Sequence, residues 1–318
     1  MIALLAALLM FEHHALHIEG SSTVAPILAE ALDEAGLYDA DLHPNGTVVG
    51  FRRMCVDRAV NLVGASRRIT EEERAACREN QVSDVAEIPL GQDGLVLAMT
   101  ARNRALRMDL RELYLAAAFM VPEDDTCQLI PNPNRSWSDI DRSLPRRPIR
   151  FYGPPVGSGT RDMFVDLALA EGARQIDCLA ELERRDPQAF TMAIVPRHDE
   201  AWFDAGENDA ALSVALRYAH DAIGIFGWNA FEAAADLRAV TINGISPNRR
   251  TIVDGRYPLS RPLFLYATAE SLTEPRVRRL LTTLQRGDEP GQVRRYSTDG
   301  DGISTIESTD PKRRVRRY

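Results

Sequence analysis

The sequence predicts an α/β protein of two lobes, because short apolar segments alternate with amphipathic segments and this pattern occurs twice, far apart in the chain. The first occurrence is a strand over 15–19 and a Gly/Ser/Thr loop, followed by apolar residues at helical spacing up to Gly36. The second is a strand over 149–152, a loop over 153–159 and a helix over 160–171. Such a rhythm indicates a mostly parallel sheet with helices on both faces.

Other parts of the chain fit the same fold class. Gly172 is expected to cap the second of these helices. The proline- and asparagine-rich stretch over 122–148 is expected to be mainly loop. The remaining elements that periodicity and residue preference predict are strands over 47–51, 59–64, 84–89 and 94–100, and helices over 71–79 and 101–115.

Length and charge limit the classes of function. A chain of 318 residues with 45% hydrophobic residues can form one large core or two medium ones. The net charge of -8 argues against a nucleic-acid partner, because phosphate backbones are bound by clustered lysine and arginine. A small anion remains compatible with this charge, since a few local dipoles hold it.

Several enzyme classes lack the residues they need. Lys312 is the only lysine, so the chain has neither the core lysine of a Schiff-base enzyme nor a Walker loop. The nucleophile elbow of serine hydrolases needs Gly-x-Ser-x-Gly, but Val156 and Thr160 stand where the flanking glycines would be. The six histidines are scattered, without a defensible triad spacing. We therefore expect a binding protein that needs no cofactor.

The cysteines bear on the compartment. Their spacing contains no Cys-x-x-Cys and no neighbouring histidines, so a metal site is not expected. Two disulfides would require an oxidising compartment, whereas four buried free thiols in a cytosolic protein are the alternative. The four are Cys55, Cys77, Cys127 and Cys178.

The N-terminal stretch over 1–11 is almost entirely apolar but is too short to cross a bilayer as a helix. Its length matches the apolar region of a signal peptide, although the usual basic residues are missing. We interpret residues 1–14 as the remnant of a signal peptide, and a core strand or helix is the alternative. The basic tail over 312–317 is expected to be solvated.

Two loops carry the clearest chemical signal. Gly20-Ser21-Ser22-Thr23 and Gly157-Ser158-Gly159-Thr160 each precede a predicted helix. A helix N-terminus presents unpaired N–H groups and the positive end of the helix dipole, which together attract anions. Serine and threonine add hydroxyl donors, and glycine lets the backbone come close. One such loop is also an ordinary helix cap, but two loops in different lobes would surround an anion.

Six short blocks, in this order, resemble the periplasmic phosphate-binding proteins of Pst-type ABC importers, and the resemblance extends over about residues 15 to 285. The blocks are Ile18–Val24, Gly46–Phe51, Ala65–Arg67, Ser158–Thr160 with Asp162 and Phe164, Gly224–Trp228, and Tyr257–Phe264.

The resemblance implies a type II periplasmic-binding-protein fold, in which two α/β lobes are joined by two crossover strands and close on phosphate. We assign residues 15–99 and 257–318 to lobe one and residues 100–256 to lobe two. The resemblance also implies a disulfide between Cys55 and Cys77, which leaves Cys127 and Cys178 as the remaining candidate pair. The phosphate ligands that it implies are Ser22, Thr23, Thr47, Arg67, Ser158, Gly159 and Thr160.

Other residues near these blocks have less definite roles. Arg161 and Asp162 are further candidates in the first turn of the second helix, where Asp162 could equally complement the helix dipole. Without the resemblance, Arg67 would be a surface arginine beside Arg68. Gly157 stands where the family often has an acidic residue that accepts the proton of monohydrogen phosphate, so selectivity against sulfate stays open.

The residues and the resemblance together predict an exported, periplasmic or extracellular protein. It would capture inorganic phosphate in a cleft between its lobes and deliver it, as a monomer, to the membrane permease of an ABC importer. The alternatives are a binding protein for sulfate, molybdate or another anion, and a phosphate-ester hydrolase that uses the same cleft.

Overall fold

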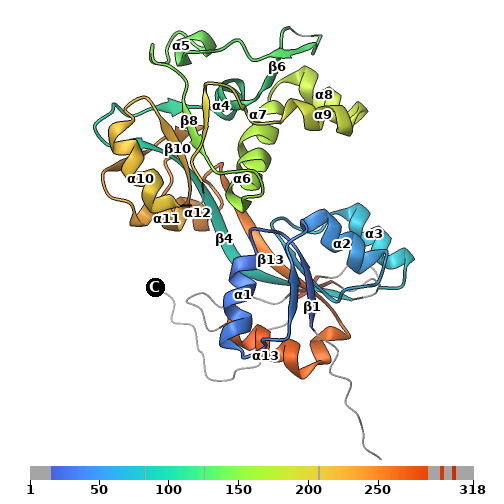
Figure 1. The fold of residues 1–318 in the computed structure, drawn as a ribbon. Helices are drawn as coiled ribbons and strands as arrows, with labels where there is room; N and C mark the ends of the chain where they lie inside the picture. Colours follow the sequence, from blue (N-terminus) through green and yellow to red (C-terminus); the bar gives the residue numbers. More distant parts are fainter. Residues whose placement is uncertain are drawn as a thin grey trace, which may run out of the picture. The chain divides into compact units, whose positions relative to one another are not determined.

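The computed structural model describes residues 16–285 except 83, 125 and 207, together with 294–296 and 303–305. The predicted signal-peptide segment and the basic tail lie outside these residues. The chain forms two compact units, unit 1 from Met1–Leu90 and Phe264–Tyr318 and unit 2 from Gly91–Leu263. It passes from one unit to the other within two strands, β4 (Val85–Thr100) and β13 (Ser260–Thr268), which are labelled in Figure 1.

Unit 1 is built on a mixed sheet. Strand β1 pairs in parallel with both β2 and β3, and β13 pairs with β3 in the antiparallel direction. The first residues of β4 pair with β14, which in turn pairs with β15. The bounds of these strands are β1 His17–Gly20, β2 Asp41–His43, β3 Leu62–Ala65, β14 Arg294–Tyr296 and β15 Ile303–Thr305.

Helices cover both faces of this sheet. A side chain at Gly64 would meet Val24, the residue before α1, and Leu28 within α1, whereas a side chain at Gly50 of α2 would meet Val63. Because successive strand residues face opposite sides, α1 and α2 lie on opposite faces. The bounds are α1 Ala25–Glu34, α2 Thr47–Cys55, α3 Glu71–Glu79, the short 3-10 turn η2 Ser271–Thr273 and α13 Pro275–Leu284.

The strand predicted over 47–51 is wrong, since these residues form the first turns of α2. Valine and phenylalanine favour strands, but tertiary packing overrides that preference. Phe51 and Cys55 are buried with Tyr266 of β13, and Cys55 forms a disulfide with Cys77 of α3. The disulfide therefore joins two adjacent helices of unit 1.

Unit 2 contains a second mixed sheet. Strand β10 is parallel to β8, β8 is parallel to β9, and β10 and β11 are antiparallel to β4. Two separate pairs, β5 with β12 and β6 with β7, lie outside it. The bounds are β5 Arg107–Met108, β6 Met120–Pro122, β7 Leu129–Pro131, β8 Phe151–Gly153, β9 Trp202–Asp204, β10 Ile223–Gly227, β11 Leu237–Ala239 and β12 Thr241–Ile242.

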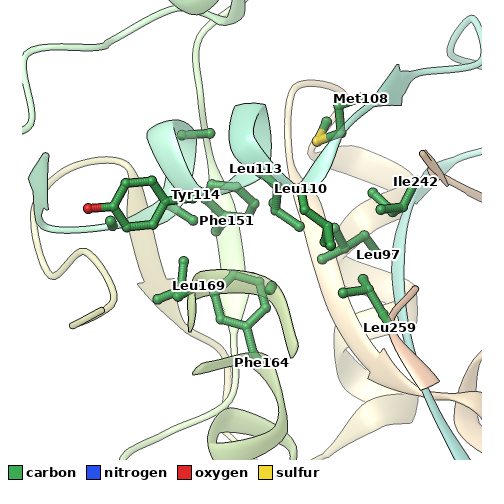
Figure 2. Packing of buried hydrophobic residues seen from close by; sticks show 14 of the residues in the cluster. Leu97, Met108, Leu110, Leu113, Tyr114, Phe151, Phe164, Leu169, Ile242 and Leu259 are labelled. Atoms are coloured by element: carbon green, nitrogen blue, oxygen red, sulfur yellow. The ribbon is translucent and has the colours of Figure 1, made fainter. Parts of the chain in front are cut away.

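The helices of unit 2 surround a large apolar core. Figure 2 shows Phe164 and Leu169 in this core, together with Phe151 and Leu97. A second disulfide joins Cys127 to Cys178 of α8. The bounds are α4 Leu110–Ala117, α5 Trp137–Ile140, α6 Gly159–Phe164, the π-helical η1 Val165–Ala170, α7 Glu171–Ala173, α8 Asp177–Arg185, α9 Pro187–Ala193, α10 Asp209–Tyr218, α11 Trp228–Ala233 and α12 Arg249–Val253.

Two helix boundaries differ from the predictions. The helix expected over 101–115 begins only at Leu110, because Asp109 and Glu112 form a capping box there. Gly172 does not cap the second βα helix but lies inside α7. A side chain at Gly172 would come within 2.2 Å of the Leu110 carbonyl oxygen, so glycine permits the close approach of α4.

The predicted α/β class is confirmed in both units, and the mostly parallel sheet becomes a mixed one where β4 and β13 run antiparallel to their neighbours. In the part of the chain that the structure describes, no helix is long and apolar enough to span a membrane.

Candidate functional site

In unit 1 the candidate residues gather where two parallel strands end. Gly20 at the end of β1 pairs with Gly64 near the end of β3, so the segments that follow both strands start at the same edge of the sheet. Ligands of open α/β sheets commonly bind outside this carboxyl edge. The segments are the turn with Ser22 and Thr23, and the loop with Arg67.

The turn after β1 depends on glycine. Gly20 has a φ of +130°, and a side chain there would come within 2.0 Å of the Gly64 carbonyl oxygen. The Ser21 N–H donates to that carbonyl at 2.8 Å, and the Ser21 Oγ accepts from the Thr23 N–H at 3.2 Å. These bonds hold the half-buried Ser22 and Thr23 immediately before α1.

Thr47 is the first residue of α2, and the structure brings it beside the same edge. The Gly46 N–H donates to the Gly20 carbonyl at 2.7 Å, which fixes the start of α2 next to the end of β1. The Thr47 Oγ1 accepts from the Ser66 N–H at 3.2 Å. The first turn of α2 contains no acidic residue, so no side chain of that turn offsets the positive end of the helix dipole.

Arg67 follows Ser66 and is held by a carboxylate. Its Nη1 and Nη2 donate to the two Glu73 oxygens at 2.9 and 2.8 Å, and Nη1 also donates to the Arg68 carbonyl at 2.9 Å. The Arg67 side chain is still 37% exposed, and Glu73 is 17% exposed. The guanidinium is thus kept in one place beside Ser66 with part of its surface open to solvent.

Glu73 was missed by the sequence reasoning, although a signal for it was present. It is the third residue of α3, where it forms a capping box with Thr70. The pattern Thr-x-x-Glu before a helix marks this arrangement in a sequence. The capping box restrains the carboxylate, and the carboxylate in turn restrains Arg67.

The neighbouring Arg68 has a different role. It lies 3.7 Å from the Glu87 carboxylate, which is fully buried and accepts a hydrogen bond from the Tyr266 hydroxyl at 2.7 Å. That hydroxyl accepts from the Ile69 N–H at 3.0 Å. Arg68 is therefore the ion-pair partner of a buried acid, which the sequence did not reveal.

In unit 2 the candidate loop follows β8 and ends at the helix that begins with Gly159. Gly157 has a φ of +91°, which favours glycine. Ser158 is buried and caps the helix, since its Oγ accepts from the Thr160 N–H at 3.2 Å. Gly159 and Thr160 are half-buried. With η1 and α7 the helical run extends over 159–173.

Arg161 and Asp162 occupy the first turn of this helix with different surroundings. The Arg161 Nη1 donates to the Pro154 carbonyl at 3.1 Å, and its guanidinium lies 5.0 Å from the Trp202 ring centre. Burial lowers the pKa of Arg161, while Asp204 and Asp162 oppose that shift. Asp162 is exposed, as expected for an acid that complements the helix dipole.

The structure thus forms two donor sets, one in each unit. The unit 1 set comprises Ser22, Thr23, Thr47 and Arg67, and the unit 2 set comprises Ser158, Gly159 and Thr160 with Arg161 beside them. Both consist of N–H, hydroxyl and guanidinium groups, which can donate hydrogen bonds to an oxyanion. Among the described residues, no group of histidine, cysteine, aspartate and glutamate could hold a metal ion.

Comparison with known proteins identifies the family. The profile of the PBP superfamily domain matches residues 12–282, so the chain belongs to the PBP superfamily. Protein SphX of Synechocystis is 29% identical over 267 residues, which cover 79% of this chain and 68% of SphX. The phosphate-binding protein PstS of Staphylococcus haemolyticus is 27% identical over 275 residues, which cover 82% of this chain and 73% of PstS.

Solved structures of similar proteins have the same fold as this chain. The crystal structure of a possible phosphate binding protein from Planctomyces limnophilus has a TM-score of 0.66 and 28% identity, and the match covers 86% of this chain and 88% of that one. An ABC-type phosphate transport receptor from Vibrio cholerae shares the fold, with a TM-score of 0.56, 16% identity and coverage of 86% and 94%. The similarity to phosphate-binding proteins and the predicted fold class are therefore confirmed.

Proposed function

We propose that this chain captures inorganic phosphate outside the cytoplasm and delivers it to an ABC importer. The observation that carries the proposal is the pair of donor sets, each located after parallel strands and each composed of hydrogen-bond donors. The similarity to PstS of Staphylococcus haemolyticus and to the Planctomyces protein supports phosphate as the ligand. Both donor sets would serve the same ion.

The proposed function is reversible ligand binding, with no catalytic step. A ligand that interacts with both donor sets binds one arrangement of the units more tightly than the others, and so shifts the population toward that arrangement. The lobes proposed for this process are 15–99 with 257–318, and 100–256. Arg67 would supply the charge-assisted contacts, and the helix that begins at Gly159 would supply N–H groups.

The proposed partners and compartment follow from the same function. The ion would pass to the permease subunits of the importer, with the protein acting as a monomer in the periplasm or outside the cell. The two disulfides support an oxidising compartment. Sedimentation of the purified protein tests whether it is a monomer, and fractionation of the producing cell tests its compartment.

Titration calorimetry of protein stripped of bound ligand tests the proposal. Inorganic phosphate should bind saturably, and a parallel titration with sulfate measures the selectivity. Sulfate is the informative competitor, because Gly157 replaces an acid that would accept a phosphate proton. Binding of sulfate but not phosphate would contradict the assignment, and release of product from p-nitrophenyl phosphate would favour the hydrolase alternative.

A further inference from the structure

Arg261 is a buried cation to which the proposed function assigns no role. It is the second residue of β13, within the block Tyr257–Phe264, and its side chain is only 7% exposed. Burying a guanidinium is unfavourable unless it is paired, and an apolar pair often stabilises a protein as well as a buried ion pair does. Stabilisation of the fold therefore does not by itself explain why a charged residue occupies this position.

The Arg261 Nη1 donates to the Asp166 Oδ2 at 3.0 Å. Burial lowers the pKa of Arg261, and the nearby carboxylates of Asp166, Asp93 and Asp162 oppose this shift. Burial raises the pKa of Asp93, and Arg261 opposes that shift. Asp93 lies near the start of the unit 2 part of β4, where its Oδ1 accepts from the Gly94 N–H at 2.8 Å. All four residues belong to unit 2.

Asp166 places this ion pair on the helix that carries the unit 2 donor set. It is the second residue of η1, which continues α6 without a break, and Asp162 lies four residues earlier. Residues four apart share one face of a helix. The buried Phe164 and Leu169 pack into the core of unit 2 (Figure 2), whereas Asp162 and Asp166 are exposed and near Arg261.

The helix is thus held in two ways, by apolar packing and by Arg261. Apolar contacts alone tolerate small rotations about the helix axis, but a hydrogen-bonded ion pair has a defined direction. The π-helical hydrogen bonding of η1 is a feature frequently found at functional sites.

We propose that Arg261 is a positioning residue, which acts through Asp166 to fix the helix so that the N–H and hydroxyl donors of Ser158–Thr160 are aimed at an oxyanion. This role rests on the proposed function, because it needs a ligand at the unit 2 donor set. It makes the crossover strand β13 part of the recognition apparatus, although Arg261 itself does not touch the ligand.

Arg197 provides a matched control. It is fully buried in the same unit and is bound by Asp199 at 2.9 and 2.7 Å, but its other partners are the carbonyls of Ala116 and Asn134. These contacts do not involve the helical run over 159–173. Replacement of either arginine by methionine removes a buried cation and its ion pair with an acid, although Asp199 keeps its contact with Arg135 at 2.9 Å.

The test combines calorimetry of inorganic phosphate binding with melting temperatures. Arg261→Met and Arg197→Met should both lower the melting temperature, but only Arg261→Met should weaken phosphate binding, by about tenfold or more, and Arg261→Lys should recover part of the loss. Unchanged affinity in Arg261→Met, or an equal loss in Arg197→Met, would overturn the proposal.

Asp166→Asn separates positioning from simple charge and covers the case in which Arg261→Met does not fold, since Asp166 is 61% exposed. A long-range charge effect would strengthen anion binding when this acid is neutralised. Positioning predicts the opposite sign, a loss of about threefold or more, because the ion pair is broken. Tighter binding in Asp166→Asn would therefore contradict the inference.

Hydrogen exchange distinguishes failure of this inference from failure of the proposed function. In ligand-free protein the amides of Asp162 and Val165, which donate to the Ser158 and Arg161 carbonyls, should exchange faster in Arg261→Met than in wild type, and Arg197→Met should leave them unchanged. If wild type binds no phosphate, the proposed function fails while this measurement still decides the positioning role. Unaltered exchange at these amides in Arg261→Met would overturn it.

Discussion

The two donor sets are supported in different ways. In unit 1 the set is surrounded by charged contacts, in which Arg67 is held by Glu73 and Arg68 lies beside the buried Glu87. In unit 2 the donors are mainly neutral groups at the start of one helix, and the buried cation Arg261 contacts that helix further along. The unit 1 set thus includes a cation with its own counter-ion, whereas the unit 2 set relies mainly on N–H and hydroxyl groups at one helix start, with Arg161 beside them.

This difference predicts how strongly amino-acid substitutions in each donor set weaken ligand binding. The unit 1 set depends on a few strong contacts, so single substitutions there should have large effects. The unit 2 set shares its donors among backbone N–H groups that no side-chain substitution removes. Losses at its hydroxyls should therefore be smaller.

The largest effect is expected from the disulfides. Removing Cys55–Cys77 or Cys127–Cys178 by paired serine substitutions should lower the free energy of unfolding by about 3 and about 4 kcal/mol, because the loops enclose sequence separations of 22 and 51. Denaturant titration measures both. Only the unit 1 pair should also weaken phosphate binding, since it joins the helices that carry Thr47 and Glu73. Equal loss of affinity from both pairs would contradict this distinction.

The disulfides also bear on the compartment. Thiol titration of denatured, unreduced protein from its native source should find no free thiol. Four free thiols would contradict export to an oxidising compartment.

The next effect is at Arg67. Arg67→Ala should weaken phosphate binding by about 2 to 4 kcal/mol, or roughly thirtyfold to a thousandfold, because it removes charge-assisted bonds and leaves the Glu73 carboxylate facing the anion. Adding Glu73→Gln to Arg67→Ala should recover part of the loss. Calorimetry with inorganic phosphate measures each variant.

Arg78→Ala is the control for this prediction. Arg68 is unsuitable, although it is adjacent, because its loss would leave the buried Glu87 without its ion pair. Arg78 forms a surface pair with Glu71, at 3.7 Å, on the same helix as Glu73, and such pairs contribute little. The two variants change net charge equally. Equal loss of affinity in both would show that Arg67 makes no specific contact.

Thr160→Val should have a smaller effect on binding. It keeps the shape of the side chain but removes a hydroxyl donor, with an expected cost of about 1 to 2 kcal/mol, or roughly fivefold to thirtyfold. Thr191→Val on α9 of the same unit is the control, because the Thr191 Oγ1 donates only to the Gln188 carbonyl within its own helix. A loss at Thr160 as large as that at Arg67 would erase the difference between the two donor sets.

The smallest expected effect is a pH dependence in the framework of unit 2. Burial by itself would raise the pKa of Asp199, but hydrogen bonds from Arg197, the Ala201 N–H and Arg135 outweigh it and lower the pKa to about 2. A lowered pKa stabilises the folded state above the unfolded value, and this contribution disappears as pH falls from about 4 to about 2.

Melting temperatures measured across that range test this dependence. A chain with Arg197→Met and Asp199→Leu should lose less stability between about pH 5 and about pH 2 than wild type does. An identical pH dependence in the two proteins would contradict the role of Asp199. Phosphate affinity at neutral pH should be unaffected, because neither residue contacts the unit 2 donor set.

Local signals made much of the fold predictable. The helix over Glu71–Glu79 was predicted at these residues, and its determinants are local, since Thr70 caps it and acids fill its first turn. The helix at Thr47 was not, since its apolar face exists only through packing against Tyr266 and the disulfide to Cys77. Valine-rich segments of this kind are decided by tertiary contacts.

In the candidate site, too, the local features were predictable from the sequence and the distant contacts were not. The two glycine-containing loops were visible in the sequence, and the structure places Thr47 and Ser66 beside the first of them. The partners of the arginines were not visible where they are distant in sequence, as with Asp166 and Arg261, which are 95 positions apart. No periodicity or local motif encodes such a pair.

Equilibrium dialysis of stripped protein with radiolabelled phosphate tests the central claim most directly, because it counts the ions bound per chain. If both donor sets serve the same ion, wild type binds one phosphate per chain. Arg67→Ala and Thr160→Val then lower the affinity of that one event without changing its stoichiometry. Two phosphates per chain, with each variant affecting a different one, would contradict the account.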